Sequence, residues 1–151
     1  MIKIITVGFL KEKYLRDAVE EYSKRIKKYT NLQIIELKDK GILEKNKAIL
    51  VEGEKILQNI KEKEYVITLE IEGNSLSSEK FAEKIDKTFL INSNITFIIG
   101  GSYGLSKEVK NRANYSLSFS KMTFPHQLFR IMLLEQIYRS FKINNNESYH
   151  K

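Results

Sequence analysis

A glycine-rich segment follows the most apolar stretch of the chain. Residues 95–99 (ITFII) are apolar except for one threonine, and Gly100, Gly101 and Gly104 come after them. Glycines let the backbone turn sharply and approach a ligand closely, and open α/β sheets bind ligands at the carboxyl ends of their strands. The segment lacks the Gly-Lys-Ser/Thr of a P-loop and the glycine spacing of a dinucleotide site. A ligand loop and a plain turn both remain open.

Two other segments have the composition of a binding loop. Residues 69–74 (LEIEGN) leave a second apolar strand for a turn, and residues 119–126 (FSKMTFPH) alternate apolar side chains with hydroxyls and one lysine before a helix. Apolar surface for a purine face, with backbone N–H and C=O groups for its edge, is the usual lining of a cofactor pocket. The alternative is an ordinary strand-to-helix loop whose phenylalanines belong to the core.

Metal and hydrolytic chemistry have little support in the sequence. His126 and His150 are the only histidines and there is no cysteine, so the donors are too few to close a structural zinc site. No Gly-x-Ser-x-Gly segment offers a nucleophilic serine. His126 follows the single proline, Pro125, where a histidine more often caps or packs than acts as a base. We expect no metal and no hydrolytic triad.

Arg130 is the only polar residue within the apolar stretch 129–134. A buried guanidinium needs a partner, because an unpaired charge is costly to bury. The sequence leaves open whether this partner is Glu135, a carboxylate of a second chain, or a phosphate or cofactor group.

The C-terminal residues Tyr149, His150 and Lys151 combine an aromatic ring, an imidazole and an ammonium group. These types suit stacking on a nucleic acid base and contact with a phosphate, so a role in RNA binding is one interpretation. The other is a frayed tail, which is what chain termini usually form.

The elements that must position these segments alternate between strand and helix. Periodicity predicts strands over 2–7, 32–37, 65–69, 95–99 and 115–118, and helices over 12–29, 42–60, 77–90, 107–112 and from Pro125 onward. A strand as apolar as 95–99 needs both faces covered, which is typical of a central parallel strand. We therefore predict an α/β fold with a mostly parallel sheet covered by helices, in a single domain over residues 1–151.

The last predicted helix is apolar on all sides rather than along one stripe. Its apolar residues are 128, 129, 131–134, 137, 138 and 141. Such a helix must be covered on more than one side, and in a chain of 151 residues we expect a homodimer partner to provide the second cover.

Charge and length restrict the class of protein further. The chain has 26 basic and 19 acidic residues, a net charge of +7, and residues 100–151 hold eight basic against three acidic residues. This excess favours a polyanionic partner such as RNA, although a lysine-rich composition would also explain it. The apolar start of the chain is too short to cross a bilayer and lacks a signal-peptide cleavage site, so we expect a cytoplasmic protein with no membrane partner.

Five segments, in order, resemble the RlmH family, bacterial 23S rRNA pseudouridine N3-methyltransferases of the SPOUT class. They are 69–73 (LEIEG), 97–104 (FIIGGSYG), 117–127 (LSFSKMTFPHQ), 135–139 (EQIYR) and 149–150 (YH). The resemblance covers the chain in length and in motif order. It implies a SPOUT methyltransferase fold with a C-terminal trefoil knot, an exception to the rule that chains do not thread loops. It also implies a homodimer.

The resemblance implies S-adenosylmethionine (SAM) as cofactor and, as substrate, N3 of a pseudouridine in the helix-69 stem-loop of 23S rRNA in the assembled ribosome. Matched motif by motif, the cofactor positions are Leu69, Gly100, Phe119, Ser120, Lys121, Met122, Thr123 and Phe124. Our hypothesis is that the catalytic residues are His150 and Tyr149, with Arg139 or Lys151, and that they orient or deprotonate the nucleotide. The alternative is a non-catalytic ribosome-associated RNA-binding protein on the same fold.

Overall fold

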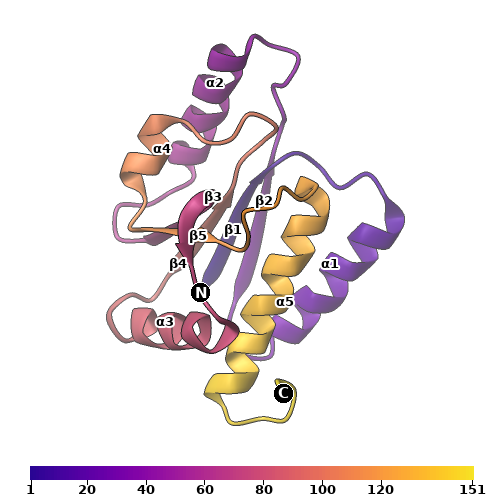
Figure 1. The fold of residues 1–151 in the computed structure, drawn as a ribbon, viewed down its shortest axis with the longest axis vertical. Helices are drawn as coiled ribbons and strands as arrows, with labels where there is room; N and C mark the ends of the chain where they lie inside the picture. The colour runs from indigo at the N-terminus through magenta and orange to yellow at the C-terminus, as the bar shows by residue number, and fades with distance from the viewer.

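The computed structural model describes all residues from 1 to 151. Strands and helices alternate along the chain, as Figure 1 shows. Their bounds are β1 (Ile2–Val7), α1 (Lys13–Ile26), β2 (Leu32–Leu37), α2 (Lys45–Gln58), β3 (Tyr65–Ser75), α3 (Ser78–Ile91), β4 (Ile95–Ile99), α4 (Lys107–Arg112), β5 (Tyr115–Ser118) and α5 (His126–Asn144).

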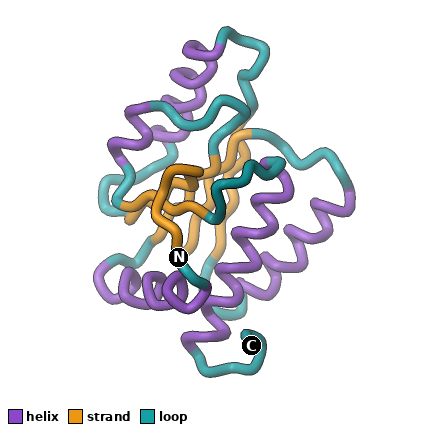
Figure 2. The backbone as a smooth tube through the Cα atoms, viewed as in Figure 1, coloured by secondary structure: helices purple, strands orange, loops and turns teal.

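The five strands form one sheet in the order β2-β1-β4-β3-β5, and every neighbouring pair is parallel. The sheet lies in the middle of the molecule with helices around it (Figure 2). All residues of β1 and β4 are buried, which agrees with the prediction that the most apolar strand is central. The predicted α/β fold with a parallel sheet is therefore confirmed.

Side chains alternate between two apolar clusters on the two faces of the sheet. Ile4 and Phe97 belong to the larger cluster, which includes side chains of α1, α3 and α5. Ile5 and Ile98 belong to the smaller one, which includes side chains of α2 and α4. This period of two is what a strand buried on both faces requires.

Two helices are shorter than predicted. α1 ends at Ile26 rather than near Tyr29, and α2 begins at Lys45 rather than at Ile42. The carboxylate of Glu44 accepts hydrogen bonds from two backbone N–H groups of the first turn of α2 and so fixes its start.

β3 extends beyond the predicted end at Leu69, so that prediction is wrong. Leu69 and Asn74 both pair with Leu117 of β5, and the four residues between them form a bulge. Gly73 closes the bulge against β5, where a Cβ atom would lie only 2.8 Å from the backbone of Leu117. A side chain at this position would clash with the neighbouring strand.

α5 packs on the sheet between α1 and α3 (Figure 1). Its inward face is buried through Leu133, Leu134 and Ile137, whereas Leu128 near its start remains 41% exposed. No helix has the length and apolar composition needed to cross a membrane. The homodimer partner and the trefoil knot stay predictions.

Candidate active site

Three segments that the sequence singles out meet around one cavity of about 350 Å³ at the carboxyl ends of β3, β4 and β5. Leu69 comes from β3, Gly100 from the turn after β4, and the third segment from the loop between β5 and α5. Of the eight predicted cofactor positions, seven line the cavity: Leu69, Gly100, Phe119, Ser120, Met122, Thr123 and Phe124. Lys121 is exposed and lies outside the lining.

The turn after β4 is tight because three of its residues lack side chains. A Cβ atom on Gly100 would lie 2.8 Å from the side chain of Leu105 and 3.1 Å from the backbone of Gly104. Gly104 has a φ of +87°, which L residues with side chains rarely adopt, and its N–H donates to the carbonyl of Gly101 at 3.1 Å. Backbone atoms therefore form this wall of the cavity.

Aromatic rings form another wall. The Phe119 and Phe129 rings lie 4.9 Å apart between centroids, and Phe124 stacks on Phe129 at 6.5 Å. The Ser120 hydroxyl accepts from the N–H of Met122 at 3.0 Å and holds the loop in a turn. The loop thus offers apolar surface beside backbone polar groups, the combination that cofactor pockets use.

Sequence reasoning missed two lining side chains. Phe129 reads as one of many apolar residues of α5, and Lys110 as a solvent-exposed residue of a polar helix. Lys110 Nζ lies 3.5 Å from the Glu70 carboxylate across the cavity mouth, and Glu70 also accepts from the Thr68 hydroxyl at 2.7 Å. The opposite charges of Lys110 and Glu70 are the only signal in the sequence that could have indicated this contact.

Glu52 of α2 lies behind the glycine turn and is 4% exposed. One carboxylate oxygen accepts from the N–H of Lys40 at 2.8 Å, and the other has no hydrogen-bond partner. A Cβ atom on Gly101 would lie 2.9 Å from that second oxygen. Burial raises the pKa of the Glu52 carboxyl, because a low-dielectric environment disfavours its charged form.

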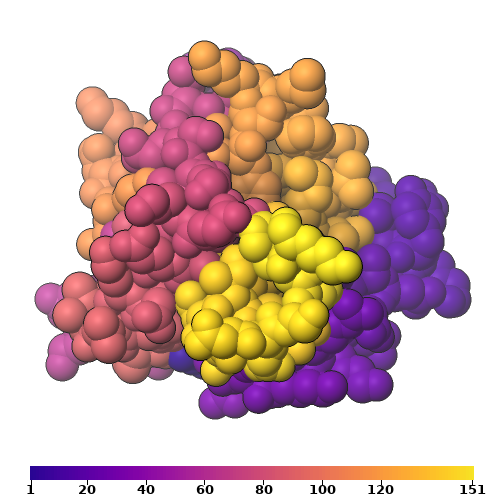
Figure 3. Space-filling view, turned by 60° about the horizontal axis from the view of Figure 1, so that its bottom comes forward, coloured from indigo at the N-terminus to yellow at the C-terminus, as the bar shows by residue number.

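The structure brings the three predicted catalytic residues together. Arg139 Nη1 lies 3.0 Å from His150 Nδ1, and the Tyr149 hydroxyl donates to Glu135 at 3.0 Å. Arg139 also donates to Glu135 through Nε at 3.0 Å, and His150 Nε2 lies 2.7 Å from Glu79 of α3. The tail lies between α3 and α1 (Figure 3), so the expectation of a frayed tail is wrong. The reason is that its polar groups find fixed partners.

The protonation states in this cluster follow from its contacts. A guanidinium has no acceptor, so His150 Nδ1 accepts from Arg139, and the neutral ring therefore carries its proton on Nε2 and donates it to Glu79. Burial, and then the hydrogen bond to Glu135, raises the pKa of Tyr149 to about 12. The hydrogen bond from His150 lowers the pKa of Glu79. At neutral pH the Tyr149 phenol is therefore a donor and cannot act as a base.

The cluster and the cavity lie at opposite ends of α5. Phe129 lines the cavity and Arg139 is ten residues further along the helix, which corresponds to about 15 Å. Within one chain, therefore, the structure does not bring the predicted catalytic and cofactor residues together.

The partner of Arg130 differs from each candidate in the sequence. Its guanidinium donates to Glu36 at 2.6 Å, to the Thr6 hydroxyl at 3.1 Å and to the carbonyl of Gly8 at 3.0 Å. Arg130 thus joins the start of α5 to the ends of β1 and β2. Glu135 lies more than one helical turn away from Arg130 along α5. It belongs instead to the tail cluster, which consists of Glu79, Glu135, Arg139, Tyr149 and His150.

The sequence profile of the family described as "Predicted SPOUT methyltransferase" matches residues 1–150. The chain belongs to this SPOUT methyltransferase family. Two similar relatives named "Ribosomal RNA large subunit methyltransferase H" come from Clostridium botulinum (strain Alaska E43 / Type E3) and Clostridium acetobutylicum. Each is 57% identical to this SPOUT methyltransferase over 157 aligned positions that cover 99% of both chains.

A solved structure supports the SPOUT methyltransferase fold. It is described as a probable methylase family protein from Haemophilus influenzae Rd KW20, and it superimposes with a TM-score of 0.59 over 99% of this chain and 70% of its own. At 15% identity this likeness shows the fold alone.

Proposed function

We propose that this SPOUT methyltransferase transfers a methyl group from SAM to N3 of a pseudouridine in the helix-69 stem-loop of 23S rRNA within the assembled ribosome. The observation that carries the proposal is the convergence of three separate segments on one cavity in a chain of a methyltransferase family. The names of the relatives support rRNA as the substrate. In this proposal the chain is a cytoplasmic enzyme with a single domain over residues 1–151.

The cavity fits SAM in its volume and its lining. About 350 Å³ is within the range of small-molecule sites. The Phe119 and Phe129 rings offer apolar surface to an adenine, and the turn at Gly100 lets backbone groups approach a ligand without a side chain between them. Seven of the eight assigned residues line the cavity and would contact the cofactor directly. Lys121 is outside the lining and would affect binding only through the conformation of the loop.

When bound, SAM supplies a methyl group on a positively charged sulfur. The chain's own task is to present the pseudouridine N3 without its proton, and a fixed cation beside the base favours that anionic form. Arg139 is such a cation, because two hydrogen bonds to Glu135 hold its guanidinium. His150 is the candidate proton acceptor. In the docked tail Nε2 carries the proton and Nδ1 accepts from Arg139, so the nucleotide has to displace Arg139 from Nδ1 before His150 can accept a proton there.

We propose that a second subunit completes the site. The tail cluster is about 15 Å from the cavity of its own chain, so a tail from another copy would have to approach the cavity. Apolar side chains beside the cavity support this: Met122 is 72% exposed, and Phe9 and Leu128 are also exposed. The N–H of Lys11 donates to Gln127, which places the segment with Phe9 next to the start of α5. Leu128→Asp should therefore give a monomer in analytical ultracentrifugation and abolish methyl transfer.

Two measurements test the function. Calorimetry should detect SAM binding near micromolar affinity, about −8 kcal/mol. Mass spectrometry of 23S rRNA from a deletion strain should show one pseudouridine that lacks a methyl group, and the intact gene should restore it. If SAM does not bind and the 23S rRNA of the deletion strain has the same methyl groups as that of the wild type, the chain is a non-catalytic RNA-binding protein.

Removal of residues 149–151 tests the role of the tail. We expect methyl transfer to be abolished while calorimetric SAM affinity is retained, because none of these residues lines the cavity. Ser148→Ala is the matched control, since Ser148 lies in the same tail, is exposed and makes no side-chain hydrogen bond. Full activity of the truncated chain would refute the assignment of Tyr149 and His150.

A further inference from the structure

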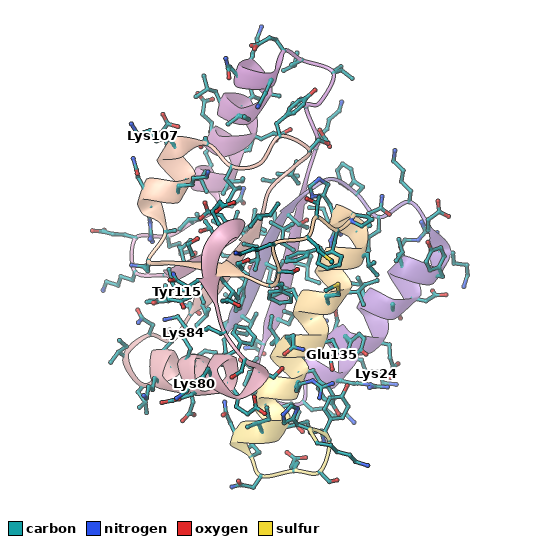
Figure 4. The ribbon with its side chains drawn as sticks, in the orientation of Figure 1. Lys24, Lys80, Lys84, Lys107, Tyr115 and Glu135 are labelled. Carbon is teal, nitrogen blue, oxygen red and sulfur yellow. The ribbon has the colours of Figure 1, made fainter.

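A second hollow, of about 390 Å³, lies at the other end of the sheet from the cavity. Tyr65 and Tyr115 begin β3 and β5, whereas the cavity lies where these strands end. The rest of the hollow is lined mainly by α3, through Lys80, Lys84 and Lys87. Figure 4 shows Lys80, Lys84 and Tyr115 on one side of the molecule, where α3 faces β5. We call this hollow the lysine–tyrosine groove.

Lys84 is held in a fixed position within the groove. Its ammonium lies 3.7 Å from the centroid of the Tyr115 ring, and it donates to the Tyr65 hydroxyl at 3.2 Å. It makes no salt bridge with a carboxylate. A cation held by a ring face and one hydroxyl keeps donors free for an anion, and it loses less side-chain entropy on binding than a free lysine would.

Lys80 and Lys87 lie one turn to either side of Lys84 on the same face of α3. Both contact Glu83, at 3.1 Å for Lys80, and these contacts lower the pKa of the Glu83 carboxyl. The groove thus holds three ammonium groups against one carboxylate, a net charge of +2. Lysines in a row beside aromatic rings match the repeating charges and bases of a nucleic acid strand.

The groove also adjoins the tail cluster. Glu79, which precedes Lys80 on α3, is the residue that contacts His150 at 2.7 Å. A strand that follows α3 from Lys87 to Lys80 would therefore reach the tail without leaving the surface.

We propose that the lysine–tyrosine groove is a second RNA-docking site that holds the sugar-phosphate backbone of the rRNA substrate outside the target nucleotide. The inference rests on the proposed function for the identity of the RNA. It adds a contact that no segment of the cavity provides, and it assigns to α3 the task of guiding the strand toward the tail. Phosphates contact the three lysines, and the half-buried Tyr65 and Tyr115 hold Lys84 in position for them.

The salt dependence of binding tests the proposal. Filter binding of protein-free 23S rRNA, without cofactor, compares the wild type with the triple variant Lys80→Gln/Lys84→Gln/Lys87→Gln. Loss of two to three phosphate contacts should lower the slope of log K against log salt by about 1.4 to 2.1, and affinity at about 0.1 M salt roughly 25- to 125-fold. The matched control, Lys45→Gln/Lys47→Gln/Lys55→Gln, changes the same charge on exposed positions of α2 and should leave the slope within about 0.7 of wild type, one contact.

The Tyr115 ring should contribute to RNA affinity separately from the charges of the lysines. Tyr115→Leu keeps every charge but removes the surface that holds Lys84, so affinity should fall several-fold with little change in slope. Tyr115→Phe keeps the ring face and should bind like the wild type. Circular dichroism melting checks that each variant is folded.

Several outcomes would overturn the proposal. Equal losses of RNA affinity in the α3 and α2 triple variants would mean that binding depends only on the net charge of the protein. No loss for the α3 variant would exclude the groove, and a loss seen with whole ribosomes but not with protein-free rRNA would identify a ribosomal protein as the partner. Because these measurements need no methyl transfer, they are independent of the mass-spectrometric test of the proposed function.

Discussion

Replacing Glu36 by alanine removes the only carboxylate that contacts the Arg130 guanidinium. Arg130 is 1% exposed, and its Nε atom already lacks a hydrogen-bond partner. Without Glu36, the charge keeps only two neutral acceptors, the Thr6 hydroxyl and the carbonyl of Gly8. A buried cation with no counter-charge is strongly destabilising, so we expect Glu36→Ala to weaken both the fold and the attachment of α5 to the sheet.

The size of the effect follows from burial. Removing one partner of a fully buried ion pair costs about 3–5 kcal/mol. The Glu36 side chain is 34% exposed, so solvent screens part of the interaction and we expect about 2 kcal/mol. For a chain of 151 residues this corresponds to a drop in Tm of about 4–8 °C.

Thermal melting followed by circular dichroism measures the change, at one fixed protein concentration because the proposed dimer would make Tm concentration-dependent. Asp17→Asn is the control, since both side chains of the Lys13–Asp17 pair are more than half exposed and its loss should change stability by less than about 0.5 kcal/mol. The double variant Glu36→Ala/Arg130→Met should melt above Glu36→Ala, because it removes the uncompensated charge. A double variant less stable than Glu36→Ala would refute the reasoning.

Three further predictions concern the cavity, the core and the tail. Gly100→Ala should weaken SAM binding at least tenfold in calorimetry, because its Cβ would lie 2.8 Å from Leu105, and unchanged affinity would exclude this turn from the site. Glu64→Gln should destabilise the fold by about 3 kcal/mol in a melt, since the Lys3–Glu64 pair is at most 5% exposed; a Tm like that of wild type would contradict this. Absorbance titration should show a phenol near pH 12 that Tyr149→Phe removes. This raised pKa means that the Tyr149 phenol stabilises the folded state up to pH about 10, its unfolded value, and that the contribution is lost as pH rises through about 12.

Local patterns were sufficient to predict most elements of the fold. β1 and β4 have the predicted bounds because each is a short, mostly apolar run, which is typical of a strand covered on both sides. The sequence offers Ser77 or Ser78 as the cap of α3, and in the structure it is Ser77, whose hydroxyl accepts from the N–H of Lys80. Such signals lie within a few residues of the element that they define.

Other features depend on residues that are distant in the chain. The bulge in β3 exists because Leu69 and Asn74 pair with the same residue of β5, and the periodicity of β3 contains no trace of this. The partner of Arg130 is 94 residues away, and that of His150 is 71 residues away. Three of the segments around the cavity could be recognised by composition, whereas composition alone did not predict that they converge, which followed from the family resemblance and is seen in the sheet order.

The all-parallel sheet has a consequence for the time course of folding. No two strands form a hairpin, and β1 pairs with β4 through Ile2 and Ile95, so the centre of the sheet closes only after 92 intervening residues are available. Such non-local pairing gives a high contact order, because loop entropy is lost before any contact is gained. In the sheet, β4 is the strand that joins β1 and β2 to β3 and β5, so the two parts of the sheet can pair only once β4 is in place. We therefore expect the residues around the cavity and those of the core to become ordered together, late in folding.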